Sequence, residues 1–358
     1  MVVREGRPGS FGRSTERFGL EQAFPARSPY NHSSMTVSVR SFAKINLGLR
    51  IGPPRRDGFH DLLTVYQTIA LHDVIRVGVG RGSGIEIRCA DPRVPQDESN
   101  TCFRIVDRAM AALGAKGRIV IEIDKRLPVQ GGLGGASANA VATLLGLEQA
   151  LRKKLTQSER LQIAAEIGSD LPLFLVGGTV LGLGRGELVF PLPDFPATPC
   201  VVVTPAIGVS TPKAFAEWDH RMKASGPKLT RPGASDRMDE LSCSLSAWLS
   251  EMYSSAPSDL KRGRAGNPLF RLDRAGIEND FEQVVFLEYP KLGEAKGALL
   301  RAGAKYASLS GSGSTLYGVF GSREAARLAA NRLRRADWSA EETTTLTRAV
   351  YWRRLHGT

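Results

Sequence analysis

The segment PVQGGLGGASA, residues 128–138, decides the organisation of this 358-residue chain. It stands between an apolar, β-branched run at 119–123 and an alanine-rich run at 138–151, which predicts a strand, a glycine loop and a helix. Glycines let a backbone come close to an anion, and the N–H groups of the next helix's first turn point at that anion. The segment therefore indicates a phosphate-binding loop, although a flexible glycine turn without a ligand has the same composition.

Two common phosphate-loop patterns do not fit this segment. A Walker A loop ends in Gly-Lys-Ser/Thr, whereas Gly135 is followed by Ala-Ser. The dinucleotide pattern G-x-G-x-x-G fits at Gly132 and Gly134, but Ser137 stands where its last glycine belongs. Both patterns are excluded by spacing, and the loop needs another interpretation.

Charge and length limit the classes to which the protein can belong. At 358 residues the chain is long enough for two domains, and its hydrophobic content of 42% is that of an ordinary soluble protein. A formal net charge of +12 indicates an anionic partner, which is either a nucleotide or a nucleic acid. No basic run interleaved with aromatic residues is present, so we predict no nucleic-acid partner.

Cysteine usage and hydropathy indicate a cytoplasmic protein without metal ligands or a membrane partner. The four cysteines lie far apart with no C-x-x-C, and the five histidines do not group with them. The longest apolar stretch, 171–183, is too short to span a membrane and is broken by glycines and a proline. Residues 1–34 lack the apolar segment of a secretory signal and precede Met35, where the strand pattern begins. We expect them to be a disordered extension or to lie upstream of a true start at Met35.

Hydrophobic periodicity predicts an α+β chain in two domains. The first domain, 35–198, holds the glycine loop, with a further helix or tight turn starting at the Ser-Asp-Leu-Pro of 169–172. The second domain, 199–358, ends with helix, strand, strand, helix and strand on one antiparallel sheet, the closing strand covering 343–352. Within it, 219–275 reads as a long exposed basic insertion that holds one helix around 241–252.

The pattern Pro-x-x-x-Gly-Leu-Gly-x-x-Ser of 128–137 resembles the ATP loop of the GHMP kinase superfamily, which includes galactokinase, homoserine kinase and mevalonate kinase. Further family-like segments follow in order: AKINLGL at 43–49, RDGFH at 56–60, GSDLP at 168–172, NDFE at 279–282 and SGSG at 310–313. The resemblance implies an N-terminal domain like ribosomal protein S5 domain 2 and a ferredoxin-like C-terminal domain. It also implies transfer of the γ-phosphoryl group of ATP, with Mg²⁺, to the hydroxyl of a small alcohol.

The resemblance assigns the chemistry to Lys44 and Asp170. Asp170 would accept the proton of the substrate hydroxyl, and Lys44 would position Asp170 and the phosphoryl oxygens. Phosphoryl transfer requires mainly alignment and neutralisation of charge, which such a pair supplies. As alternatives, Asp170 is a suitable helix N-cap before Leu-Pro, and Lys44 is a solvated strand residue. Lys44 has mostly apolar neighbours, however, so it requires a partner or a role.

The remaining family positions divide between nucleotide and acceptor. The nucleotide side comprises Asn100, Pro128, Val129, Gln130, Gly131, Gly132, Leu133, Gly134, Gly135, Ala136, Ser137 and Ala138. Gln130 and Ala136 depart from the glycines that many relatives have, and Asn100 could equally cap a helix. The acceptor side comprises Asn46, Phe59, His60, Ser210 and Thr211, of which the three polar ones also suit loop or cap roles.

Phe59 and His60 distinguish the possible acceptors. The member of the superfamily that these segments resemble places an aromatic residue and a histidine here against a cytosine, which implies a cytidine diphosphate alcohol as substrate on the methylerythritol phosphate route to isoprenoid precursors. Phe59 keeps the ring of the usual tyrosine and loses its hydroxyl, so stacking is retained. Other small-alcohol kinases, of the homoserine or mevalonate type, have no base to stack. We expect a monomer or a weak homodimer.

Overall fold

The computed structural model describes residues 36–129, 131–224, 234–254 and 267–356. Contacts between Cα atoms divide the chain into Met1–Ser33 and Ser34–Thr358, and the description below concerns the second unit. The predicted disordered extension at 1–34 and Gln130 lie outside the described residues, as do parts of the predicted basic insertion. The unit is α+β, as the hydrophobic periodicity predicts.

The first sheet is built on a long antiparallel hairpin. Strand β1 (Thr36–Pro54) pairs with β2 (His60–Gly80) along almost its whole length, with register shifts near Phe42, Asn46 and Ile51. The strand order is β3-β4-β2-β5-β6, with β1 on the other edge of β2. The remaining strands are β3 (Ile85–Cys89), β4 (Arg118–Asp124), β5 (Thr179–Leu183) and β6 (Leu188–Pro191).

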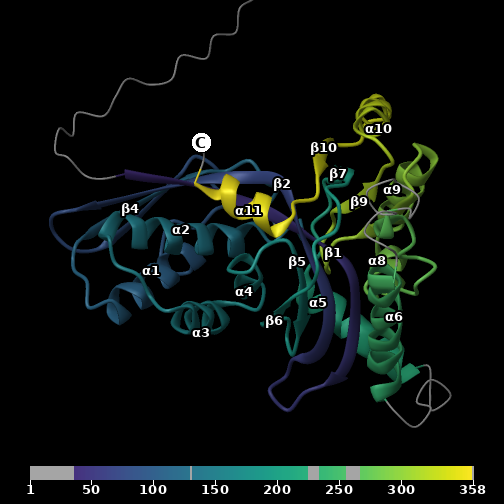
Figure 1. Cartoon of the computed structure of the whole chain (residues 1–358), viewed down its shortest axis with the longest axis horizontal. Helices are drawn as coiled ribbons and strands as arrows, with labels where there is room; N and C mark the ends of the chain where they lie inside the picture. Colours follow the sequence, from purple (N-terminus) through teal and green to yellow (C-terminus); the bar gives the residue numbers. More distant parts are fainter. Residues whose placement is uncertain (1–35, 130, 225–233, 255–266, 357–358) are drawn as a thin grey trace, which may run out of the picture. The chain divides into compact units, whose positions relative to one another are not determined.

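Four helices accompany this sheet: α1 (Thr101–Ala112), α2 (Gly135–Leu151), α3 (Gln157–Ile167) and α4 (Leu171–Phe174). Figure 1 shows α1, α2 and α3 together on one side of the long strands. A Cβ at Gly146 would lie 3.0 Å from Val77 and 3.3 Å from Val39, so this glycine lets α2 pack closely on the sheet. A capping box formed by Thr156 and Glu159 starts α3.

The second sheet has the order β10-β7-β9-β8, and all of its strand pairs are antiparallel. Its strands are β7 (Pro199–Val203), β8 (Tyr306–Leu309), β9 (Leu316–Val319) and β10 (Ala340–Thr344). Helices α9 (Pro290–Arg301) and α10 (Arg323–Arg335) pack on it, and α8 (Glu282–Glu288) precedes α9. The predicted order of helix, strand, strand, helix and strand is confirmed, whereas α8 and β6 were not predicted.

The predicted insertion is less exposed than its composition indicates. It contains the end of α5 (Thr211–Ala224), then α6 (Ala234–Ser254) and the 3₁₀ turn Pro268–Phe270. The one predicted helix is present, but α6 packs against β1 and buries Leu241, Leu245 and Trp248 in the core. Their spacing of four and three residues is that of a buried helix face, which the surrounding serines and charges conceal.

The predicted closing strand at 343–352 is wrong over most of its length. Strand β10 ends at Thr344, and α11 (Arg348–Leu355) follows. The β-branched run suits a strand, but the Thr347 hydroxyl accepts a hydrogen bond from the Val350 N–H and starts a helix. Tyr351 and Leu355 of α11 belong to the core of the first sheet, so the last described helix packs on the N-terminal half of the chain.

The predicted domain boundary at 198/199 coincides with the start of β7. A third core cluster joins the two sheets, however, with Ile45 of β1, Val202 of β7 and Tyr317 of β9 among its members. The boundary therefore stays a prediction, and the two sheets form one connected interior. That connection fixes the residues of both sheets around a shared cavity.

Candidate active site

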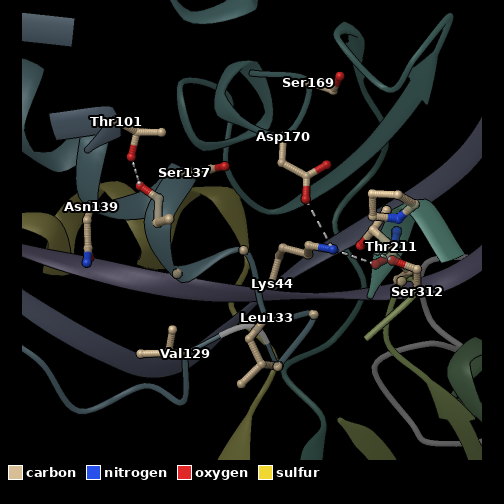
Figure 2. A pocket seen from close by; sticks show the side chains of 18 of the residues that line it. Lys44, Thr101, Val129, Leu133, Ser137, Asn139, Ser169, Asp170, Thr211 and Ser312 are labelled. Carbon is tan, nitrogen blue, oxygen red and sulfur yellow. Dashed lines mark hydrogen bonds and ion pairs between the residues drawn. The ribbon is translucent and has the colours of Figure 1, made fainter. Parts of the chain in front are cut away.

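A cavity of about 960 Å³ collects most of the predicted site residues. Its walls come from the glycine loop, the middle of β1, the turn before β2, Asp170 and the first turns of α5. Figure 2 shows Lys44, Asp170 and Thr211 among the side chains that line it. All predicted site residues line the cavity except Gln130, which is not described, and Ala138 and Ser210.

The glycine loop needs glycine at two described positions. Gly132 has φ 82°, and a Cβ there would lie 2.2 Å from the Ser310 carbonyl oxygen. Gly134 has φ 70° and is the N-cap of α2. The first turn of α2 carries no acidic residue, and Gly134 brings no side chain to cap it. Its N–H groups are therefore placed to bind an anion.

The SGSG turn at 310–313, in the second sheet, is hydrogen-bonded to the glycine loop. The Ser310 hydroxyl donates to the Gly132 carbonyl at 3.0 Å, and the Thr315 N–H donates to the Gly131 carbonyl at 3.1 Å. The Lys44 N–H donates to the Leu133 carbonyl at 3.0 Å. Two segments that the family resemblance ties to the loop therefore contact it directly.

A buried aspartate fixes the chain that enters the loop. Asp73 is fully buried, and its Oδ1 accepts hydrogen bonds from the backbone N–H groups of Arg126 and Leu127, both at 2.7 Å. Its Oδ2 lies 2.8 Å from the Lys125 ammonium and accepts from the Asn139 amide at 3.0 Å. We call these four interactions the Asp73 clamp. The clamp joins the end of β4, before the loop, to α2, after the loop. The sequence did not predict it, because Asp73 stands in an apolar strand without a motif.

The predicted catalytic pair is formed. The Lys44 ammonium lies 3.3 Å from Asp170 Oδ2 and donates to Asn46 Oδ1 at 2.7 Å. Figure 2 shows the Lys44 and Asp170 side chains pointing toward each other. The Lys44 side chain is only 4% exposed, whereas that of Asp170 is 32% exposed, so a ligand in the cavity can reach the carboxylate. Asp170 precedes α4, but its side chain makes no capping hydrogen bond, contrary to the alternative role.

A second partner of Asp170 was not predicted. The Tyr66 hydroxyl donates to Asp170 Oδ1 at 3.0 Å, so both carboxylate oxygens have a protein partner. The β1–β2 register places Tyr66 opposite Asn46, which brings its ring beside the Lys44 ammonium. Burial, followed by the nearby Asp170 charge, raises the pKa of Tyr66 well above its usual value. Tyr66 therefore stays protonated at neutral pH and donates to the carboxylate.

The opposite end of the cavity is aromatic. Phe59 is half exposed, and the Arg185 guanidinium lies 5.0 Å from its ring centroid. His60 is buried, stacks on Phe215 at 5.0 Å and 13°, and places Nε2 2.8 Å from Asp219 Oδ1. Phe215 and Asp219 were not predicted. Their spacing of four residues, which places both on one face of α5, was the available signal.

Comparison with known proteins identifies the family. The model of the GHMP kinases N terminal domain matches residues 100–178, and the model of the GHMP kinases C terminal region matches 259–339. A 4-diphosphocytidyl-2-C-methyl-D-erythritol kinase of Solibacter usitatus (strain Ellin6076) is 38% identical over 287 residues, which cover 80% of this chain and 82% of that protein. The chain belongs to the GHMP kinase family. It is an ATP-dependent kinase, as its sequence predicts.

Further relatives support the same family and fold. The kinase of the same name from Acaryochloris marina (strain MBIC 11017) is 35% identical over 300 residues, 84% of this GHMP kinase and 92% of the relative. A crystal structure of 4-(cytidine 5'-diphospho)-2C-methyl-D-erythritol kinase, 28% identical, matches with a TM-score of 0.64 over 86% of this chain and 98% of that one. The predicted two-part GHMP kinase fold, S5-like and ferredoxin-like, is confirmed.

A homoserine kinase structure from Cytophaga hutchinsonii is 20% identical with a TM-score of 0.64, covering 90% of this GHMP kinase and 98% of that chain. At that identity the match concerns the fold alone. The aromatic end of the cavity must therefore be judged from this chain's own residues.

Several predicted positions have a structural role in this GHMP kinase. The Asn100 side chain caps α1 through the Cys102 N–H at 2.9 Å, which is the alternative role, although it also lines the cavity. The nucleotide contact predicted for Ala138 does not fit, because its side chain is buried in the core and its N–H donates to the Gly134 carbonyl. The acceptor contact predicted for Ser210 does not fit either, because Ser210 is exposed before α5 and outside the cavity lining.

The other predicted positions are compatible with a bound ligand. Ala136 lies in the first turn of α2 with helical backbone, so its methyl group strains nothing. The Thr211 hydroxyl lies 2.7 Å from that of Ser312, which links α5 to the SGSG turn (Figure 2). The Asn46 amide donates to the Thr64 hydroxyl at 2.8 Å and so presents its oxygen to Lys44.

Two absences concern the described part of the chain only. None of its helices is both long and apolar enough to cross a membrane. Among the same residues, no three histidine, cysteine, aspartate or glutamate side chains gather as metal ligands. Oxygen-bearing side chains of the cavity such as Asp170 and Ser137 therefore stand singly and are not part of a cluster of metal ligands.

Proposed function

We propose that this GHMP kinase transfers the γ-phosphoryl group of MgATP to the 2-hydroxyl of 4-diphosphocytidyl-2-C-methyl-D-erythritol, in the non-mevalonate synthesis of isoprenoid precursors. One observation carries the proposal: a single cavity has the anion-binding loop at one end, aromatic rings at the other and the Lys44–Asp170 pair between them. The names of the relatives at 38% and 35% identity support the choice of substrate.

Asp170 is the general base of the proposed reaction. Its carboxylate accepts the proton of the substrate hydroxyl while that oxygen bonds to the γ-phosphorus and the bond from phosphorus to the leaving ADP oxygen breaks. Lys44 and Tyr66 hold the two carboxylate oxygens and so fix the direction in which Asp170 accepts the proton. The Lys44 ammonium also offsets negative charge on the phosphoryl oxygens during the transfer.

The loop end of the cavity is proposed to hold the nucleotide. The N–H groups at the start of α2 would bind phosphate oxygens, and the Ser137 hydroxyl would donate to a phosphate oxygen or a metal-bound water. Isolated oxygen donors suit Mg²⁺, which usually retains several waters and binds through one or two carboxylates and the phosphates of its substrate. Asp170 and Ser137 are the residues that would face it. Bound Mg²⁺ supplies charge neutralisation on the phosphates.

The aromatic end is proposed to hold the cytidine diphosphate. Phe59 and Phe215 both offer ring faces to the cavity, and a pyrimidine stacks on such a face. His60, held by Asp219, is placed to hydrogen-bond the polar edge of the base. The Arg185 guanidinium beside Phe59 matches the charge of a diphosphate. Homoserine and mevalonate carry neither a base nor a diphosphate, so they would leave these groups without partners.

The substrate is tested by measuring ADP release with three acceptors in parallel: the cytidine diphosphate alcohol, mevalonate and homoserine. We expect ATP-dependent turnover with the first acceptor alone. Turnover with mevalonate or homoserine and none with the cytidine compound would overturn the proposal.

We further propose a cytoplasmic enzyme that acts as a monomer or weak homodimer on small molecules, without a nucleic-acid partner. The cysteines are free thiols, and burial raises the pKa of Cys102 and Cys200 to about 12, so neither forms a reactive thiolate. Light scattering of the full chain after gel filtration tests the oligomeric state. A stable tetramer would contradict it.

A further inference from the structure

A second cavity, of about 620 Å³, lies on the face of β1 that is turned away from α2. Val37 and Val39 of β1 are buried in the core that α2 covers, so the alternating residues Ser38 and Arg40 point to the opposite face. The walls come from β1, β2, the segment after β4 and the end of α11. We call it the basic cavity, because five of its lining residues are Arg40, His72, Arg126, Arg354 and His356.

Positive charge in the basic cavity is only partly neutralised. No described residue of its lining is acidic. Arg126 has an ion pair with Asp124, with its Nη2 2.6 Å from Oδ2. Arg40 uses one of its N–H donors on the Arg354 carbonyl at 3.1 Å. For the Arg354 guanidinium, no hydrogen bond or ion pair to another described residue is found. Among the described residues, three arginines from separate segments thus face one space with one carboxylate, that of Asp124, paired to them.

Two histidines also line the basic cavity. His72 Nδ1 lies 2.8 Å from the Ala70 carbonyl oxygen and donates its proton to it. Burial lowers the pKa of His356, so its imidazole is neutral at physiological pH. The three arginines keep their charge throughout the physiological pH range and are the fixed cations of the cavity.

We propose that the basic cavity binds a small free anion that carries phosphate groups and at least two negative charges. A guanidinium offers parallel N–H donors that match phosphate oxygens, and Arg40 and Arg354 both have such donors to spare. A multivalent anion would also relieve the mutual repulsion of three like charges. The volume is within the usual range for a bound small molecule. This site is separate from the proposed kinase reaction and does not depend on it.

The position of the basic cavity relates it to the ATP loop. His72 and Arg126 line it, and each is the chain neighbour of a member of the Asp73 clamp. Lys125, the residue before Arg126, lines the large cavity instead. The two cavities are therefore lined by neighbouring residues of the same short segments.

Inorganic pyrophosphate is the probe for this proposal, titrated calorimetrically into the full chain. We expect saturable binding that weakens at least tenfold in Arg354→Gln. The matched control is Arg353→Gln, which removes the same charge from the same helix at an exposed residue outside the lining, and we expect less than a twofold effect. Amide hydrogen exchange locates the site: pyrophosphate should protect 38–42, 70–74 and 350–355.

Three results would overturn the proposal. Absence of saturable binding is the first. Equal weakening by the two arginine substitutions is the second, because it would indicate diffuse attraction to a basic surface. Exchange protection confined to 131–138 is the third, because it would place the anion on the glycine loop alone. The exchange map of the unsubstituted chain needs no variant, so the test stands even where Arg354→Gln fails to fold.

Discussion

Replacing Tyr66 by phenylalanine removes one hydroxyl and keeps a ring that fills the same space. In the structure that hydroxyl donates to Asp170 Oδ1 at 3.0 Å. A hydrogen bond to a charged group is worth about 1.5–3 kcal/mol. Because the Asp170 side chain is 32% exposed, water replaces part of the lost interaction. We therefore expect the substitution to remove about 1 kcal/mol of transition-state stabilisation. Each 1.36 kcal/mol corresponds to a tenfold change in rate, so kcat should fall about fivefold.

Steady-state ADP release with both substrates at saturation measures this change. The KM for ATP should stay within twofold, because no hydrogen bond joins Tyr66 to a described residue of the loop. Tyr351→Phe is the matched control: its buried hydroxyl donates to the Phe174 carbonyl at 2.7 Å, so its loss lowers stability without touching Asp170. An unchanged kcat in Tyr66→Phe, or an equal fall in both variants, would refute the positioning role.

Three further predictions concern the loop, the base and the thiols. Asp170→Asn should lower kcat by about 10²–10⁴-fold while ADP affinity, measured by calorimetry, stays within twofold; near-normal turnover would remove Asp170 as the base. Gly132→Ala should abolish ATP binding or folding, because its Cβ would meet the Ser310 carbonyl oxygen at 2.2 Å, whereas Gly208→Ala, with nothing within 4 Å, should leave both unchanged. Burial raises the pKa of Cys102 and Cys200 to about 12, so a thiol reagent at pH 8 should leave both unlabelled in the folded chain. Rapid labelling of either cysteine would contradict its burial.

The sequence predicted the structure correctly where a local pattern of residues has a direct physical cause. Glycine spacing predicted the loop because positive φ at Gly132 and Gly134 leaves few other residues possible. Lys44 and Asp170 are far apart in the chain, and only the family resemblance joined them before the structure placed their side chains 3.3 Å apart. Periodicity also predicted the strand before the loop and the order of helices and strands in the second sheet, because one buried face imposes a spacing that can be read directly.

The remaining site residues depend on contacts that no local pattern encodes. Tyr66 and Asp73 stand in an apolar run, so the sequence gives no sign that they belong to the site. The strand register places Tyr66 beside Asp170 and Asp73 beside the segment that enters the loop. Phe215 and Asp219 become site residues only because α5 lies across from His60. The closing strand was wrong because the β-branched residues before α11 carry a stronger strand tendency than the single cap at Thr347 carries for a helix.

The long β1–β2 hairpin has a consequence for how such an enzyme can change its acceptor. Its middle carries Lys44, Asn46 and Tyr66, whereas Phe59 and His60 at its tip contact Arg185 and α5. Exchanging the tip and the facing turn of α5 would therefore alter which alcohol is admitted while the base, its partners and the nucleotide loop keep their places. In the proposed function the hairpin thus separates acceptor choice from phosphoryl chemistry, and grafting its tip would test that separation.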